Sequence, residues 1–288
     1  MAKRQEVVKK IEVIKSPKDI LDEILPTRYR LKCKNQVQKE FATLINDHEI
    51  VIASGPAGVG KSYVAVARAL ELLQNKTSPY DKIIISTPAE EAGENLGYLP
   101  GNLREKMEPY LASTFDVFDK IIGKKKRLEL EEAEILLIQP LGFIRGKSID
   151  NTILIMEEAQ NMTPMQMKTL LTRIGDNSKF IISGDLDQSD RFKNPKHTGL
   201  YDAIHRHKNV NTIGFMEFAD IEENFVRNPI IKKILDNYKT DLTIEEVDAS
   251  NKGKSGKTIR VKPNVVRHDT RFKLFSKIKA WFKKNFKR

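Results

Sequence analysis

The stretch Gly55-Pro56-Ala57-Gly58-Val59-Gly60-Lys61-Ser62 constrains the fold of this chain more than any other feature. It matches the pattern G-x-x-x-x-G-K-[ST], with an apolar run at Ile50–Ala53 before it and a helical pattern at Lys61–Leu73 after it. Glycines let backbone N–H groups converge on phosphate oxygens, and the following helix points its N-terminus at the same anion. We therefore predict a strand, a phosphate-binding loop and a helix. In such a loop Lys61 would meet the β and γ phosphates of ATP, and Ser62 would place its hydroxyl on Mg²⁺.

Apolar runs divide much of the remaining chain into alternating strands and helices. The runs are continuous, which is typical of parallel strands that helices cover on both faces. The predicted strands are Ile50–Ala53, Ile83–Ser86, Ile135–Ile138, Thr152–Met156, Phe180–Ser183 and Thr212–Phe215. The predicted helices are Lys61–Leu73, Leu103–Ile122, Met165–Ile174 and Ile221–Tyr238. This alternation predicts one α/β domain, a RecA-like P-loop NTPase with a mostly parallel sheet.

Charge is unevenly distributed along the chain. The net charge is +11, yet residues 249–288 contain 14 Lys or Arg and one acidic residue, which leaves −2 for residues 1–248. We expect an N-terminal extension at residues 1–32, the ATPase domain at 33–239, and a basic flexible linker with an amphipathic tail at 240–288. In the tail, the apolar residues from Leu274 to Phe282 are spaced for one face of a helix.

Carboxylates and a glutamine follow two later strands. Glu157 and Glu158 come directly after Thr152–Met156. In this arrangement one carboxylate holds the metal through its water shell, and the other orients or deprotonates the attacking water. Gln188 comes soon after Phe180–Ser183 and is a candidate sensor of the γ-phosphate. Ligands bind outside the carboxyl ends of parallel strands, so we expect Glu157 as a metal ligand and Glu158 and Gln188 as catalytic groups.

Five stretches make the chain resemble the PhoH family of P-loop ATPases, which is related to superfamily 1 helicases. They are the phosphate-binding loop, Glu91–Gly101 with the sequence EAGENLGYLPG, Phe143–Lys147, Glu157–Gln160 and Gly184–Gln188. The likeness covers roughly residues 34–239, and Glu91–Gly101 is its most specific part because generic P-loop proteins lack it. The resemblance implies an ATPase that uses Mg²⁺. The chain departs from the family at Glu157, where Asp is usual, and at Thr87, where Arg is common.

The resemblance also suggests further site residues. Arg227 aligns with a family arginine and is a candidate arginine finger, a group that often comes from a neighbouring subunit. Arg145 aligns with another family arginine. A surface salt bridge is the alternative for both. Gln36 is a candidate for reading the adenine, although its position fits the start of a helix equally well.

Partners and location follow from the charge pattern and from the single P-loop domain. We expect the chain to act on single-stranded RNA or DNA as a homo-oligomer, a ring being one arrangement, because the chain shows no second motor domain and the basic tail would meet an anionic partner first. The alternative is a nucleotide-gated binding module without strand separation, in peripheral contact with a membrane through the tail. The charged start, the single Cys33 and the lack of a long apolar run favour a cytoplasmic protein.

Overall fold

The computed structural model describes residues 15–88, 103–144, 146, 148–228 and 230–238, and the backbone of 241–246 and 259–264. The chain divides into two compact units, Met1–Asn228 and Pro229–Arg288. Three sequence features lie outside the described residues: the stretch Glu91–Gly101, the side chain of Arg145 and the apolar face predicted from Leu274 to Phe282. Among the described residues, no helix combines the length and apolar character that crossing a membrane requires.

A six-stranded sheet forms the centre of the first unit. Its strands are β1 (Ile50–Ser54), β2 (Lys82–Ser86), β3 (Leu136–Ile138), β4 (Thr152–Met156), β5 (Lys179–Gly184) and β6 (Ile213–Glu217). They lie in the order β3-β2-β4-β5-β1-β6, and every neighbouring pair is parallel. The predicted α/β class and parallel sheet are confirmed, and the β4 strand has the bounds that the sequence predicted.

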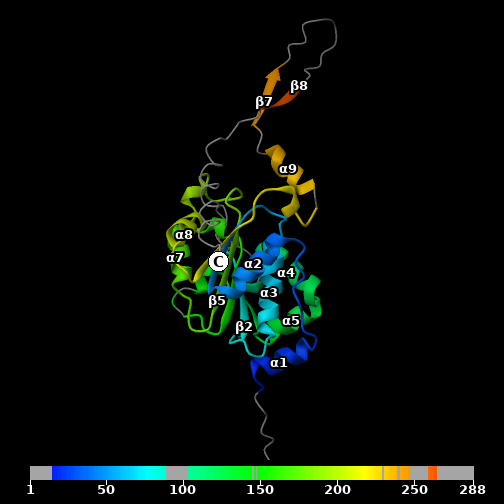
Figure 1. Cartoon of the computed structure of the whole chain (residues 1–288), viewed down its shortest axis with the longest axis vertical. Coiled ribbons are helices and arrows are strands. Elements are labelled where there is room, and N and C mark those ends of the chain that lie inside the picture. The colour runs from blue at the N-terminus through cyan, green and yellow to red at the C-terminus, as the bar shows by residue number, and fades with distance from the viewer. Residues whose placement is uncertain are drawn as a thin grey trace, which may run out of the picture. The chain divides into compact units, whose positions relative to one another are not determined.

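Helices cover both faces of this sheet (Figure 1). One face carries α1 (Pro17–Ile24), α2 (Gln36–Asp47), α3 (Lys61–Leu73), α4 (Leu103–Ile122) and α5 (Lys124–Glu132). The other carries α6 (Leu141–Ile144), α7 (Pro164–Leu171) and α8 (Gly199–His207). In β1, Val51 and Ala53 pack into the first core while Ile50 and Ile52 pack into the second. A strand buried on both sides needs apolar residues at every position, which explains the continuous runs in the sequence.

Local signals determine where the helices around the site begin. Gly60 precedes α3 in the left-handed conformation, so the chain turns sharply there and the helix begins at Lys61 as predicted. Thr163 caps α7, its side chain accepting from the backbone of Gln166 while the Gln166 side chain accepts from Thr163 N. The helix predicted at Met165–Ile174 therefore begins one residue earlier, at Pro164, and it ends at Leu171.

The predicted start of the last helix of the domain is wrong. The helix predicted from Ile221 begins instead at Ile230, as α9 (Ile230–Tyr238), after the short 3-10 helix η4 (Glu222–Asn224). Pro229 disfavours a helical Asn228, and the backbone N–H groups of Val226 and Arg227 bond to Gly58 instead of continuing a helix.

The predicted flexible linker contains two strands that the sequence analysis missed. In the second unit, β7 (Asp241–Glu246) and β8 (Ile259–Asn264) pair antiparallel, with Asp241 opposite Asn264. Apolar and polar residues alternate in both segments, which is the signal for such strands.

Candidate phosphate-binding site and catalytic cleft

The loop between β1 and α3 has room only for glycine at two of its turns. A Cβ atom at Gly55 would lie 2.5 Å from Phe218 Cβ and 2.7 Å from the Phe218 carbonyl oxygen. At Gly60, φ is +91° and a Cβ atom would lie 2.5 Å from Gln38 Nε2. Side chains at these positions would collide with neighbours and strain the backbone. The loop is thus shaped as a backbone cradle, the form that phosphate recognition requires.

Lys61 holds its charge inside the cradle. Its Nζ donates to the carbonyl oxygens of Gly55 at 2.6 Å and Pro56 at 2.9 Å. Burial lowers the pKa of Lys61 below its ordinary value, and the nearby carboxylates of Asp185, Glu157 and Glu158 oppose that shift. The amine therefore lies inside the loop, held by two backbone carbonyl oxygens, and burial is the dominant influence on its pKa.

The carboxylate of Glu157 joins the loop to the neighbouring strand ends. Its Oε2 accepts hydrogen bonds from Ser62 Oγ at 3.0 Å and from Ser183 Oγ at 2.9 Å. Burial raises the pKa of Glu157 above its usual range, while the two hydroxyls and Lys61 oppose the shift. Its Oε1 is buried without a hydrogen-bond partner in the described structure. An acceptor oxygen in that condition is an available ligand for a cation.

These groups fit Mg²⁺. The donors are a hydroxyl at Ser62 and a carboxylate at Glu157, both hard oxygen groups. Within the described residues, no cluster of three or more His, Cys, Asp or Glu could hold a metal on its own. Mg²⁺ usually keeps several waters and takes one or two protein ligands plus substrate phosphates, so a sparse donor set beside a phosphate cradle matches its needs.

Gln160 connects the two loops that follow β4 and β5. Its Nε2 donates to Glu158 Oε2 at 2.6 Å and to the Gln188 carbonyl oxygen at 3.3 Å. Its Oε1 accepts from the Asp185 backbone N–H at 3.0 Å, and the residue is only 1% exposed. Glu158 has a left-handed backbone, with φ of 55° and ψ of 35°. Sequence analysis gave Gln160 no role, because one amide can satisfy three partners only once the fold has brought them together.

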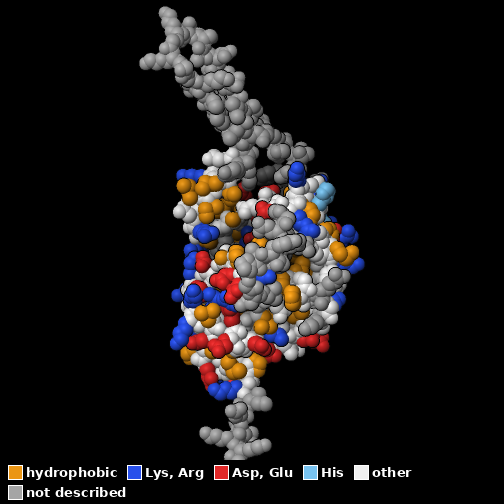
Figure 2. Space-filling model, turned by 180° about the vertical axis from the view of Figure 1, so that it is seen from behind, with side chains coloured by type: hydrophobic (Ala, Val, Ile, Leu, Met, Phe, Trp, Pro, Cys, Tyr) orange, Lys and Arg blue, Asp and Glu red, His pale blue; other side chains and the backbone are white. Residues whose placement is uncertain are grey.

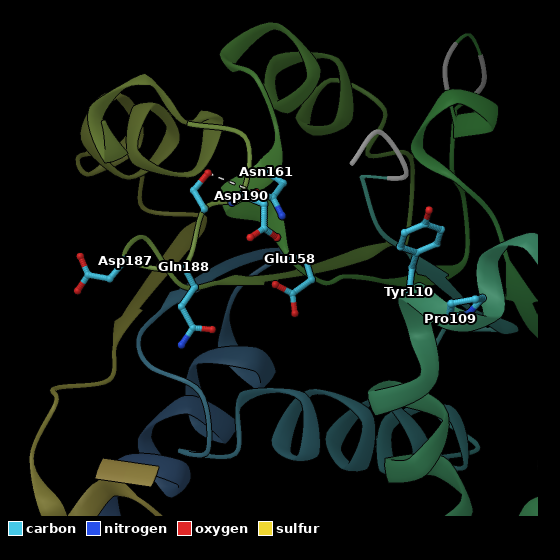
Figure 3. Close-up of a pocket in the computed structure, with 8 residues that line it drawn as sticks. Pro109, Tyr110, Glu158, Asn161, Asp187, Gln188 and Asp190 are labelled. Carbon is cyan, nitrogen blue, oxygen red and sulfur yellow. Dashed lines mark hydrogen bonds between the residues drawn. The ribbon is translucent and has the colours of Figure 1, made fainter. Parts of the chain in front are cut away.

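Glu158 and Gln188 line one cleft of about 640 Å³. The loops after β4 and β5 form one wall, and α4 supplies the other with Pro109 and Tyr110 (Figure 3). The remaining lining residues are Asn161, Asp187, Ser189 and Asp190. The structure therefore brings together the two groups that the sequence predicted for water activation and phosphate sensing.

The start of α2 supports the loop from outside. Gln38 is buried, its Oε1 accepting from Lys34 N at 2.8 Å and its Nε2 donating to the Val59 carbonyl oxygen at 3.0 Å. Gln36 is the first residue of α2, and its exposed side chain donates to Glu40 at 3.4 Å. The sequence predicted a role for Gln36 and none for Gln38. The signal that could have identified Gln38 is its position on the buried helix face that Phe41 and Ile45 also occupy.

The segment after β6 returns to the same loop. The backbone N–H groups of Val226 and Arg227 donate to Gly58 O at 3.1 and 3.3 Å. Lys34 Nζ donates to Val226 O at 3.2 Å, and Asn35 Nδ2 donates to Glu223 O at 3.2 Å. The exposed side chain of Arg227 thus starts beside the loop of its own chain.

The cradle, the Ser62–Glu157 contact and the Gln160 bridge lie at the carboxyl ends of parallel strands, and this combination defines a P-loop NTPase fold. The model of the family described as PhoH-like protein matches residues 30–239. The chain therefore belongs to the PhoH-like family, as the resemblance predicted.

Curated relatives agree with this assignment. A PhoH-like protein of Bacillus subtilis (strain 168) is 40% identical over 208 residues, which cover 72% of this chain and 64% of the relative. A PhoH-like protein of Synechocystis is 36% identical, covering 73% and 62%. Protein PhoH of Escherichia coli (strain K12) is 34% identical, covering 71% and 57%. The match spans less than two thirds of the length of each of these relatives.

Two solved structures show a distant similarity to this chain. The HK97 bacteriophage large terminase is 10% identical with a TM-score of 0.44, covering 78% of this chain and 52% of that one. A Pif1 helicase structure, described for DNA unwinding at forked dsDNA, is 13% identical with a TM-score of 0.28, covering 65% and 44%. At these scores the two structures are too distant to indicate a function for this chain.

Proposed function

We propose that this chain binds ATP with Mg²⁺ and hydrolyses it. The observation that carries the proposal is the Glu157 carboxylate, which bonds to Ser62 of the glycine loop while its second oxygen remains free. The backbone N–H groups of the cradle would bind the phosphates, and Lys61 would neutralise their charge. When bound by Ser62 and Glu157, Mg²⁺ supplies positive charge against the phosphate oxygens.

The cleft beside the cradle provides the groups for the chemical step. Glu158 is the proposed general base, since its exposed carboxylate faces the cleft and Gln160 holds it by one oxygen. The amide of Gln188 would contact the γ-phosphate or the attacking water from the same wall. Gln160 keeps both loops in register by bonding to each.

Phosphate release from ATP and Mg²⁺ tests the proposal. We expect turnover by the parent chain and a loss of roughly a hundredfold or more in Lys61→Ala, because one charged group that stabilises the transferred phosphate is removed. A parent chain without turnover, or a Lys61→Ala chain at the parent rate, would contradict the proposal. Lys125→Ala, an exposed lysine of α5, is the matched control.

We further propose that the ATPase works on single-stranded nucleic acid as a homo-oligomer in the cytoplasm. The nucleic-acid part is supported by the charge of residues 249–288, which contain 14 Lys or Arg and one acidic residue. Figure 2 shows side chains of both signs spread over the visible face of the described body, so this face has no comparable basic field. For the homo-oligomer we expect a native mass above that of one chain.

A chain that ends at Tyr238 tests the nucleic-acid part. Each Lys or Arg that meets a phosphate releases a counterion, so tail-mediated binding falls steeply with salt. The shortened chain should keep its basal ATP turnover while its oligonucleotide binding weakens and loses most of its salt sensitivity. Equal binding by both chains would place the contact on the body. Binding of the full chain to anionic vesicles, without oligonucleotide binding by either chain, would favour the membrane-associated module.

A further inference from the structure

A shallow groove of about 320 Å³ runs along the outer face of α7. It shares no lining residue with the catalytic cleft. Its lining residues are Gly146, Met165, Lys168, Thr169, Thr172 and Arg173. Met165, Lys168 and Thr169 are three or four positions apart on one face of α7, and Thr172 and Arg173 follow directly after the helix ends at Leu171. The groove therefore lies on a rigid element.

Two large apolar side chains stand exposed at this face. Met165 is 70% exposed and Phe143, on the adjacent helix α6, is 64% exposed. They are the two most exposed large hydrophobic residues in the part of the chain that the structure describes. Helix α6 contacts α7, so Phe143 lies on the element beside the groove, although it is not one of the residues that line it. An aromatic ring and a thioether exposed together on neighbouring helices indicate a contact surface.

The groove carries two cations, Lys168 and Arg173. Among the described residues, no carboxylate oxygen lies within 4.0 Å of the charged groups of Lys168 or Arg173. Arg173 donates weakly to Thr172 Oγ1 at 3.4 Å, and its buried Nε has no partner in the described structure. Asp150, on the loop that precedes β4, accepts instead from Ser148 and from the Asp176 backbone. The groove therefore offers positive charge that this surface leaves uncompensated.

We infer that this groove binds single-stranded nucleic acid, with Phe143 stacking on a base and Lys168 and Arg173 meeting phosphates. Exposed rings beside cations are the combination that binds unpaired strands without sequence choice. A protein partner fits less well, since the cores of protein interfaces are depleted of lysine. The inference rests on the proposed nucleic-acid partner. It adds a second binding site, in the α/β domain, to the one proposed for the basic tail at residues 249–288.

Fluorescence anisotropy with labelled oligouridylate and oligothymidylate tests the inference on the full chain. Phe143→Ala should weaken binding about five- to hundredfold, the range for losing one stacked base, with an unchanged salt slope. Lys168→Ala should reduce the salt slope by about one, because one phosphate contact is lost. The matched controls are Leu128→Ala and Lys125→Ala on α5, at the opposite face of the sheet, which should bind as the parent does.

Photo-cross-linking with 4-thiouridine RNA supplies a second readout that folding defects cannot imitate. We expect cross-links in the peptides that carry Phe143 or Met165. If the parent chain binds but the variants bind equally well and cross-links map elsewhere, the groove assignment is wrong while the nucleic-acid proposal stands. If the parent chain binds no oligonucleotide, the proposed partner itself is wrong. A changed native mass in Phe143→Ala with unchanged oligonucleotide binding would make the face a subunit interface and overturn the inference.

Discussion

Ser62 Oγ donates to Glu157 Oε2 across 3.0 Å, although 95 positions separate the two residues in the sequence. This contact joins the glycine loop after β1 to the end of β4. It also positions one carboxylate so that its other oxygen, buried and without a partner in the described structure, remains available.

Glu157→Gln should uncouple nucleotide binding from Mg²⁺. Glutamine has nearly the same size and can still accept from Ser62, but it lacks the charge that a cation needs. We expect the affinity for ATP in the presence of Mg²⁺ to fall by at least about tenfold, with little change in EDTA. Titration with a fluorescent ATP analogue measures both. The control Ser183→Ala keeps the Glu157 charge and should lose less affinity for ATP in the presence of Mg²⁺. An unaltered Mg²⁺ dependence in Glu157→Gln would show that Glu157 is not a metal ligand.

The variants Gln38→Ala and Gln36→Ala should differ in how they change the affinities for ATP and GTP. Gln38→Ala removes the hydrogen bond to Val59 O, so the loop loses a support and the affinities for ATP and GTP should fall together. If Gln36 contacts the adenine base, Gln36→Ala should lower the affinity for ATP while leaving the affinity for GTP unchanged. Competition between the two nucleotides in each variant separates these effects. Base selectivity lost in Gln38→Ala instead would show that the structural role given to Gln38 is incorrect.

Much of the fold could be predicted because local signals determine it. Gly60 can adopt a left-handed turn, and apolar side chains follow Lys61 at helical spacing, so α3 has its predicted bounds. In β4, every residue from Thr152 to Met156 is buried, which is why an unbroken run identified it. The strand order was not predicted, because it depends on which crossover packs on which face.

The parts that sequence analysis missed depend on tertiary contacts. Gln38 and Gln160 are ordinary helix and turn residues until the loops they bond to arrive from elsewhere in the chain. The segment before α9 was predicted as helix from its apolar spacing, yet Val226 and Arg227 use their N–H groups on Gly58. Long-range hydrogen bonds overrode local propensity at Val226 and Arg227, whereas at Gln38 and Gln160 they added a role that the local sequence does not encode.

Arg227 should act within its own chain. Its backbone N–H bonds to Gly58 of the same chain, which favours a role in that site over the cross-subunit role expected from the sequence. Arg227→Ala should lower ATP turnover, and mixing it with Lys61→Ala should restore nothing. Turnover measured over a range of mixing ratios decides the matter. Recovery of activity in the mixture would show that Arg227 completes a neighbouring subunit's site.

Lys179 should make stability depend on pH far from the catalytic cleft. This buried residue at the start of β5 donates to the His48 and Asn46 carbonyl oxygens, and burial lowers its pKa to about 8. Between pH 8 and the ordinary value of 10.5 the unfolded chain binds more protons, so the free energy of unfolding should rise with pH, by about 2–3 kcal/mol over the window. In Lys179→Met the rise should be smaller by about this amount, while Lys125→Met should retain it in full. Parallel curves for parent and Lys179→Met in urea unfolding would refute the effect.

The most direct test of the account is the Glu158→Gln variant, followed by ATP binding and single-turnover hydrolysis on the same sample. Glutamine keeps the length of the side chain and removes only the charge that activates water. We predict nucleotide affinity within about twofold of the parent and hydrolysis slowed by roughly a hundredfold or more. Hydrolysis at the parent rate would contradict it, and would make Glu157 the next candidate for the catalytic base.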